Sequence, residues 1–146
     1  MTDIIWKQHE TIESLNLRNE HTIPAFLGIQ ITEIGTDYIK GTMPVNEKTI
    51  QPYGILHGGA SVVLAETLGS VASTLCIENL KTQVAVGVEV NANHLKPVAK
   101  GGMVTGTCRP IRVGRQIHVW QIELRDGKGD LTCVSRLTVA VVERRV

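Results

Sequence analysis

The sequence is poor in aromatic residues and has almost no excess of charge of either sign. Aromatic residues make up only 3% of its 146 residues, too few for the stacking surfaces that bind single-stranded nucleic acids. Fifteen Lys and Arg residues against fourteen Asp and Glu residues give a net charge of +1, whereas nucleic-acid-binding domains usually carry a basic excess. We therefore expect no nucleic-acid partner.

Cysteine is also scarce. Cys76, Cys108 and Cys133 are widely spaced and form no CxxC motif, so they indicate neither a zinc site nor a redox pair. Each lies in an apolar run, which favours a buried, reduced thiol. The histidines lack the spacing of metal ligands as well, and we expect no metal and no cofactor.

Apolar segments that target or anchor a chain are not expected either. Residues 1–15, MTDIIWKQHETIESL, lack the apolar core of a signal peptide, and no stretch is expected to reach the roughly 20 apolar residues of a membrane span. These features favour a cytoplasmic protein without membrane contact. With 42% hydrophobic and 20% charged residues, residues 1–146 are expected to form a single globular domain.

Two helices are predicted, one short and one long. Residues 3–19 are expected to form the short helix, with Ile5, Ile12 and Leu15 facing inward. The run that begins at Gly58, GGASVVLAETLGSVASTLCI, has no proline, is too long for a strand and is apolar nearly all round. A helix of that kind is normally buried in the middle of a domain.

Six strands are predicted from period-2 alternation, β-branched residues and short turn sequences. In the third strand, Val84, Val86, Val88 and Val90 are expected to share one face. Two strands, a long helix and four more strands indicate an α+β fold in which an antiparallel sheet packs on one helix. The expected strands are 27–34, 38–45, 83–91, 102–113, 116–125 and 131–142.

Glu66 is the only formal charge between Lys48 and Glu78 and lies near the middle of the long apolar helix. Because an ionised carboxylate is costly to bury alone, it should be protonated, paired with donors or facing a pocket. The alternative is a solvent-exposed stripe, but this helix has no stripe rich in Lys, Arg or Glu. Ser70 lies one turn further on the same face, where its hydroxyl can also bond back to the helix backbone.

The long helix begins after His57 with Gly58 and Gly59. Free N–H groups at a helix start carry a partial positive charge, and glycine lets a ligand approach the backbone closely. Such a start can hold an anion or the oxyanion of an attacked carbonyl, although a glycine pair is also common in ordinary tight turns. His57 is either a second donor or a packed residue.

The spacing of Gly58 and Glu66 indicates two copies of the chain. They are eight residues apart, about 12 Å along a helix axis, whereas an oxyanion donor and an attacking base must both lie about 3 Å from one reacting centre. Two antiparallel helices could supply both groups to one carbonyl. If both residues are catalytic, the active unit is at least a two-fold dimer with shared sites.

The segment QPYGILHGGASVVLAETLGS, the preceding MPV and the later VNANHLKP resemble the hotdog-fold acyl-CoA thioesterases. The resemblance extends from about Trp6 to Val142. It is greatest to the bacterial group acting on aromatic and hydroxylated acyl-CoAs, including 1,4-dihydroxy-2-naphthoyl-CoA of menaquinone synthesis. A sister group proofreads aryl carrier-protein thioesters in siderophore synthesis. The resemblance implies a sheet wrapped around one central helix, thioester hydrolysis without a cofactor, and homo-oligomers that are dimers paired edge to edge and often tetramers.

The resemblance also implies catalytic roles. Glu66 stands at the family's catalytic carboxylate, which is a nucleophile or a general base, and Gly58 at the position whose N–H polarises the thioester carbonyl. Gln51 and His57 match polar residues beside that carbonyl, and Ser70 matches the hydroxyl that orients the carboxylate or its water. In family members Gln51, His57 and Gly58 come from one subunit and the other two from its neighbour, which agrees with the spacing.

Contacts with coenzyme A are implied in two later parts of the chain. Lys96, Arg112 and Arg115 offer cations for its phosphates, although Lys and Arg at turns are often only solvated. The first part comprises Gly87, His94, Leu95, Lys96 and Pro97, and the second comprises Arg112, Val113, Gly114, Arg115, Gln116 and Ile117.

Two other functions fit parts of the pattern. A hydratase or dehydratase of the same fold would need an Asp/His pair near the helix start, and Asp is absent between Asp37 and Asp126. A non-catalytic acyl-CoA binder would leave the carboxylate of the apolar helix without a role. Phe26, Leu27 and Tyr53 either line the acyl pocket or pack as ordinary core residues, and the sequence selects neither of the two pathways.

Overall fold

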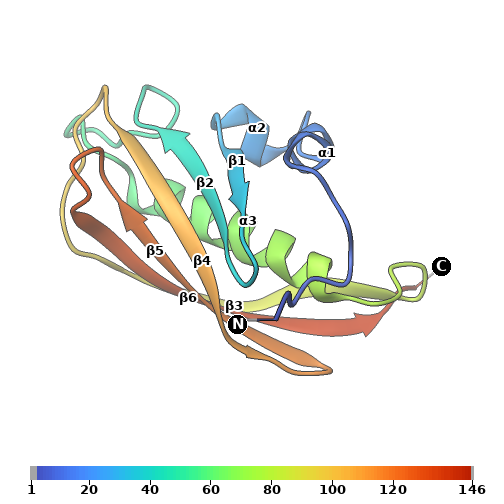
Figure 1. The fold of residues 1–146 in the computed structure, drawn as a ribbon. Coiled ribbons are helices and arrows are strands. Elements are labelled where there is room, and N and C mark those ends of the chain that lie inside the picture. Colours follow the sequence, from blue (N-terminus) through green and yellow to red (C-terminus); the bar gives the residue numbers. More distant parts are fainter. Residues whose placement is uncertain (1–2, 146) are drawn as a thin grey trace.

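The computed structural model describes residues 3–145 and contains two short helices, one long helix and a six-stranded sheet (Figure 1). All neighbouring strands are antiparallel, in the order β1-β2-β4-β5-β6-β3. The sheet curves around α3, and the predicted α+β hotdog architecture is confirmed. The helices are α1 Ile12–Arg18, α2 Ile23–Phe26 and α3 Gly58–Cys76; the strands are β1 Gln30–Ile34, β2 Ile39–Pro44, β3 Gln83–His94, β4 Met103–Val113, β5 Ile117–Arg125 and β6 Leu131–Glu143.

Two glycines of the sheet make room for a side chain of helix α3. Leu68 of α3 occupies the space beside Gly41 of β2 and Gly106 of β4, which are direct partners across the two strands. A Cβ added to these glycines would lie 2.8 and 2.7 Å from the Leu68 methyl groups. Since Leu68 is fully buried, this contact fixes the rotation of α3 and so the direction in which Glu66 leaves it.

The expectation that no segment reaches the length and hydropathy of a membrane span is wrong for α3. Its 19 residues meet both measures. The helix nevertheless contacts β2, β3, β4, β5 and β6, and half of it is buried inside the fold. It is therefore the core helix of this domain, as its nearly continuous apolar surface predicted.

A buried polar contact joins the second half of α3 to β5. Nε1 of Trp120 donates to Oγ of Ser73 at 2.7 Å, and the same oxygen lies 3.0 Å from Nδ1 of His118. The indole and the imidazole thus share one hydroxyl of α3 as their buried hydrogen-bond partner. Burial lowers the pKa of His118, so the ring is neutral at pH 7.

The N-terminal region departs from the expected helix over 3–19. Residues before Thr11 are not helical, because Thr11 caps α1 through a capping box with Ser14. Leu15 is buried as predicted, whereas Ile12 is exposed. The strand expected from residue 27 begins only at Gln30, because the short helix α2 precedes it and is followed by the left-handed Gly28 at φ 76°.

Strand β3 is longer than expected and lies at one edge of the sheet. It continues to His94, and a bulge after Gly87 changes its register with β6. The four valines therefore do not share one buried face, since Val86 and Val88 are exposed while Val90 packs against the core. An edge strand with exposed apolar side chains is a surface on which another strand can pair.

The three cysteines are free thiols. Cys108 and Cys133 are buried, as expected, and Cys76 is half-buried. Burial raises the pKa of Cys76 to about 11, so this thiol is protonated at neutral pH and is a poor nucleophile.

Candidate active site

A cleft of about 410 Å³ lies at the start of α3. It forms where the loop before α3 meets the segment after β3, and these two segments lie at the same end of the molecule in Figure 1. The structure thus brings Gln51 and Gly58 together with part of the first predicted coenzyme A set. Its lining residues are Gln51, Ile55, Leu56, Gly58, Ser61, His94, Leu95, Lys96, Pro97, Val98 and Thr132.

The N–H of Gly58 is the unused donor at the helix start. The N–H of Gly59 donates to Nδ1 of His57 at 2.8 Å, and those of Ala60 and Ser61 donate to the His57 carbonyl at 3.0 and 3.3 Å. Within residues 3–145 the Gly58 N–H has no acceptor. Because Gly58 lines the cleft, this N–H and the positive end of the helix dipole are available to a ligand.

His57 is the N-cap of α3. Its Nδ1 accepts the N–H of Gly59 and therefore carries no proton, so the neutral ring is protonated on Nε2. The side chain is exposed, which leaves Nε2–H free to donate. His57 is thus a capping residue and a possible second donor at once, rather than a residue packed in the interior.

Gln51 lines the cleft and offers it a second donor, whereas His57 is not among the lining residues. Its Oε1 accepts the backbone N–H of Tyr53, and the oxygen is occupied in this way. The amide NH₂ is the part of the side chain that remains to donate to a carbonyl. Tyr53 itself is 88% exposed and Phe26 is 66% exposed, so neither is a core packing residue, whereas Leu27 packs against the core.

His94 lies directly against the start of α3. A Cβ added to Gly58 would come within 2.6 Å of its Nε2. Glycine at position 58 therefore makes room for this imidazole as well as for a ligand. The resemblance assigns His94 to coenzyme A, and the structure places its imidazole beside Gly58, on the side where a Cβ would stand.

Glu66 lies two turns further along α3 and is half-buried. Its Oε1 is 2.8 Å from the position that a Cβ of Gly87 would take, so the glycine in β3 makes room for the carboxylate. In the described part of the chain, no hydrogen bond or ion pair involves this side chain. Gly87, predicted as a coenzyme A contact, is thus found beside the carboxylate and away from residues 94–97.

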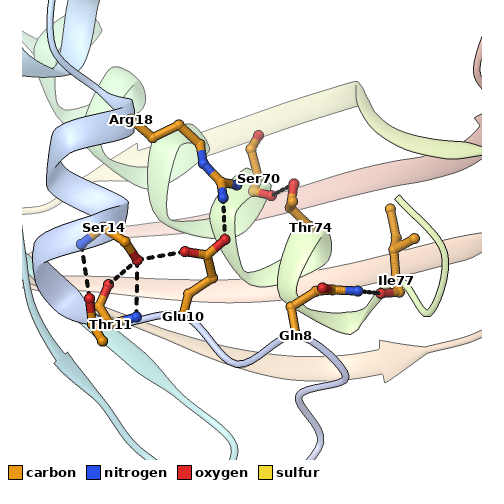
Figure 2. A network of polar contacts seen from close by, with 8 residues as sticks. All are labelled: Gln8, Glu10, Thr11, Ser14, Arg18, Ser70, Thr74 and Ile77. Atoms are coloured by element: carbon orange, nitrogen blue, oxygen red, sulfur yellow. Dashed lines mark hydrogen bonds and ion pairs between the residues drawn. The ribbon is translucent and has the colours of Figure 1, made fainter. Parts of the chain in front are cut away.

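Ser70 lies one turn beyond Glu66 on α3 and is half-buried. The side-chain hydroxyl of Ser70 does not bond back to the helix and makes no hydrogen bond with residues 3–145. The only part of Ser70 that Thr74 contacts in Figure 2 is the backbone carbonyl, which accepts from Oγ1 of Thr74 at 2.9 Å. The hydroxyl is therefore available to another group.

Lys96 is held by two carboxylates of the β5–β6 hairpin. Its Nζ lies 2.9 Å from Asp126 and 2.5 Å from Asp130. These contacts raise the pKa of Lys96, mainly through Asp130, and lower the pKa of Asp126, mainly through Lys96. One positive and two negative charges leave the group at −1, so Lys96 is not a free cation for a phosphate.

The second predicted coenzyme A segment lies at the opposite end of α3. Its turn between β4 and β5 lines clefts together with Lys7, Cys76, Arg144 and Arg145. A helix of 19 residues spans about 28 Å, so one chain does not bring the two segments together. Arg112, Val113, Gly114, Arg115, Gln116 and Ile117 all belong to this end of the molecule.

Several residues at these surfaces were not predicted. Ser61 and Thr132 line the cleft beside Gly58, and Asn19 lines a small cavity beside Ser70. The only signal in the sequence was the helical spacing that places Ser61 one turn after Gly58. Among residues 3–145 there is no group of three or more His, Cys, Asp or Glu side chains placed to hold a metal ion.

A free N–H at a helix start and an unpaired carboxylate on the same helix are the groups that acyl transfer to water requires. Comparison with known families agrees: the Thioesterase superfamily matches residues 53–133. The chain belongs to this superfamily. It is a thioester hydrolase with the hotdog fold, as the sequence predicted.

Three relatives illustrate the similarity of this thioesterase to known proteins. It is 50% identical over 139 residues to the 1,4-dihydroxy-2-naphthoyl-CoA hydrolase of Escherichia coli, covering 95% of this chain and 100% of that protein. It is 45% identical over 139 residues to the proofreading thioesterase EntH of Cronobacter turicensis, covering 95% and 99%. A crystal structure of a Haemophilus influenzae thioesterase matches with a TM-score of 0.90 and 48% identity over 95% of each chain.

Proposed function

We propose that this thioesterase hydrolyses an aromatic or hydroxylated acyl-CoA, such as 1,4-dihydroxy-2-naphthoyl-CoA, to the free acid and coenzyme A. The observation that carries the proposal is that one helix presents both the free N–H of Gly58 and the carboxylate of Glu66, which has no partner within the described residues. A thioester needs a donor for its carbonyl oxygen and a base or nucleophile. The 50% identity with a hydrolase of that name supports the acyl group.

The proposed active unit is a two-fold dimer, because about 12 Å of helix separates Gly58 from Glu66. The exposed edge strand β3 offers a surface for antiparallel pairing of two chains. Such pairing would bring the end of one chain that carries residues 94–97 near the end of the other that carries residues 112–117. A tetramer built from two such dimers is supported by the family resemblance.

In the proposed reaction the thioester carbonyl oxygen accepts from the N–H of Gly58, with Nε2–H of His57 and the amide of Gln51 beside it. In a general-base mechanism Glu66 takes a proton from water as that water attacks, and the coenzyme A thiolate leaves. In a nucleophilic mechanism Glu66 attacks first, and water then cleaves the mixed anhydride. Ser70 orients the carboxylate or its water.

Two measurements follow from this chemistry. Oxygen-18 from solvent entering Glu66 during a single turnover would support the nucleophilic mechanism, and its absence would support the general base. No step uses a metal or another cofactor, so EDTA should leave the rate unchanged.

A second candidate substrate is an aryl or acyl thioester of a carrier protein. The 45% identity with a proofreading thioesterase supports it. The catalytic groups would act in the same way on either thioester. The cations at residues 112–117 would then contact the carrier protein in place of the nucleotide of coenzyme A.

The first test is thiol release by the wild type and by Glu66→Gln from a panel of aromatic and straight-chain acyl-CoAs. We expect aromatic acyl-CoAs to be the better substrates and kcat to fall roughly 10²–10⁴-fold in Glu66→Gln, because the amide can neither take a proton nor attack. Glu78→Gln, which changes an exposed carboxylate just after α3, is the control and should keep the wild-type rate. Equal loss in both variants contradicts the role of Glu66, and release from carrier-protein thioesters alone selects the second candidate.

A further inference from the structure

One buried side-chain atom lacks a hydrogen-bond partner in the described residues 3–145, the amide nitrogen Nδ2 of Asn19. Asn19 is the C-cap of α1. Nearly all buried polar groups in folded proteins are hydrogen-bonded, so an exception calls for a physical explanation. A ligand that completes the hydrogen bond is one such explanation.

Asn19 lines a small cavity of about 130 Å³ between α1 and α3. Leu15 and Val71 give it apolar walls, and Ser70 of α3 lines it together with Asn19. The hydroxyl of Ser70 is also unbonded within residues 3–145, whereas that of Thr74 is used by the helix backbone. The cavity thus combines apolar walls with two polar groups that have hydrogen bonds to offer.

The cavity carries no net charge. Arg18 also lines it, but its guanidinium is paired with Glu10. The Ser14 hydroxyl donates to the other carboxylate oxygen of Glu10 at 2.5 Å (Figure 2). Because the charge of Arg18 is matched in this way, the cavity suits a neutral hydrogen-bonding group better than a carboxylate.

Ser70 connects this cavity to the proposed reacting centre. It lies one helical turn from Glu66, which is about 6 Å along α3. A para-hydroxybenzoyl group spans a comparable distance from its carbonyl carbon to its hydroxyl oxygen. An acyl group whose carbonyl lies at Glu66 and that runs along α3 past Ser70 therefore directs the substituent at its far end toward the cavity that Asn19 lines.

We infer that Asn19 is a specificity-determining residue whose side-chain amide hydrogen-bonds to a hydroxyl at the far end of the acyl group. The inference rests on the proposed function and adds the residue that distinguishes substrates. An amide can donate or accept, and so can a hydroxyl, so the pair forms in either orientation of the amide. An unsubstituted ring in the same place leaves the amide unpaired, and binding sites discriminate strongly against such ligands.

The test compares hydroxybenzoyl-CoA isomers with benzoyl-CoA, which differ by one hydroxyl. In the wild type, kcat/KM for the preferred isomer should exceed that for benzoyl-CoA by about tenfold or more. Asn19→Leu, which has a similar size and no hydrogen-bonding atom, should lower kcat/KM for that isomer about tenfold and leave benzoyl-CoA unchanged or better. Glu20→Leu introduces the same side chain at the next, exposed position and should keep the wild-type ratio.

The inference is overturned if Asn19→Leu keeps the wild-type ratio of kcat/KM for the preferred hydroxybenzoyl-CoA isomer to kcat/KM for benzoyl-CoA. An equal loss of kcat/KM for both substrates leaves that ratio unchanged and has the same meaning. Thermal unfolding shows whether the variant is folded, and Asn19→Ala replaces it with the same expectation if it is not. The proposed reaction is tested separately, by the loss of thiol release in Glu66→Gln. If hydrolysis is present and Asn19→Leu leaves the kcat/KM ratio of the two substrates unchanged, only the role of Asn19 is refuted.

If the wild type releases no thiol, binding decides. The probes are hydroxyphenacyl-CoA and phenacyl-CoA, whose thioether bonds cannot be hydrolysed, and the measurement is calorimetry. Tighter binding of the hydroxylated probe that disappears in Asn19→Leu supports the inference without turnover. The inference is overturned if the wild type and Asn19→Leu bind hydroxyphenacyl-CoA with equal affinity, or if neither protein binds it.

Discussion

Gly87 of β3 is the residue that sets the position of Glu66 most directly. Oε1 of the carboxylate lies 2.8 Å from the place where a Cβ at position 87 would stand. The carboxylate is the free end of a flexible side chain, so a methyl group there displaces it without moving the backbone. Gly87 therefore affects the geometry of the site more than the stability of the strand.

We predict that Gly87→Ala lowers kcat by up to about 100-fold, since displacing a catalytic group by about 1 Å can have that effect. The melting temperature should stay close to that of the wild type. Gly127→Ala is the matched control, because a Cβ there meets nothing within 4 Å. Steady-state kinetics and thermal unfolding of the two variants test this, and equal kcat values would show that Gly87 does not position Glu66.

Glu66, Gly58 and His57 could be selected from the sequence because all three are features of one helix: a lone charge in an apolar run and a glycine start. The places of Gly87 and His94 could not, because they depend on the bulge in β3 and on the distance between that strand and α3. Helical spacing shows which residues share a face of a helix, and it does not show what another strand places opposite them.

At the scale of elements, two buried hydrogen-bond contacts through one serine connect α3 to β5. Ser73 bonds to both His118 and Trp120 in the interior. His118 is 3% exposed, and its burial disfavours the charged ring. Since α3 carries the proposed catalytic residues, the state of this histidine affects the element that holds them.

We predict that the free energy of unfolding decreases as pH falls below about 6.5, the ordinary pKa of histidine. The pKa of His118 is lowered in the folded state, so between the two values the unfolded chain binds more protons, and stability rises with pH. The contribution is complete above pH 6.5 and is lost as pH falls through the folded pKa. His118→Asn, whose Oδ1 can still bond to Ser73, should make this pH dependence shallower.

Urea unfolding between pH 5 and 8 measures the effect. His9→Asn changes an exposed histidine and should retain the wild-type slope. A slope in His118→Asn as steep as that of the wild type would mean that other groups cause the acid sensitivity.

The elements themselves differ in how well the sequence predicted them. The strands and α3 followed from local alternation and from one long apolar run. The N-terminal helix is shorter than predicted, because the positions of Ile5 and Ile12 favour a continuous helix whereas the capping box at Thr11 starts α1 only at Ile12. The valines of β3 were assigned to one face because a bulge depends on pairing with β6, and no local pattern records it.

At the scale of the whole molecule, the proposed site is incomplete in one chain. The donor end of α3 and the carboxylate are separated by two turns, and the two coenzyme A segments lie at opposite ends of the helix. The helix rise alone was enough to suggest a dimer from the sequence. The exposed edge of β3 adds a surface where the second chain can pair.

A mixture of two inactive variants tests this arrangement. Gly58→Pro removes the free N–H, and its Cβ also displaces the His94 imidazole that lies beside Gly58; proline itself is well tolerated at the first helical position. His57 already has the extended conformation, φ −70° and ψ 129°, that residues before proline prefer. Mixed with Glu66→Gln in equal amounts, it should recover about a quarter of wild-type activity, because half the dimers are mixed and each has one intact site.

Each variant unfolded and refolded alone is the control and should stay inactive. Two different affinity tags verify that the subunits have exchanged in the refolded mixture. If the activity of that mixture is then no higher than that of the controls, the site does not combine residues from two chains.

The shallow attachment of α1 has a consequence for how such enzymes diverge. Helix α1 contributes one buried side chain, Leu15. The side-chain amide of Asn16 attaches the helix to β1, since its Nδ2 donates to the carbonyl of Ile31 at 2.9 Å and its Oδ1 accepts from the N–H of Ile31 at 2.8 Å. The rest of α1 can accumulate mutations without disturbing the core or the catalytic helix. If Asn19, the C-cap of α1, has the proposed role, exchange of this segment between relatives would change the substrate preference and leave the proposed catalytic groups of α3 as they are.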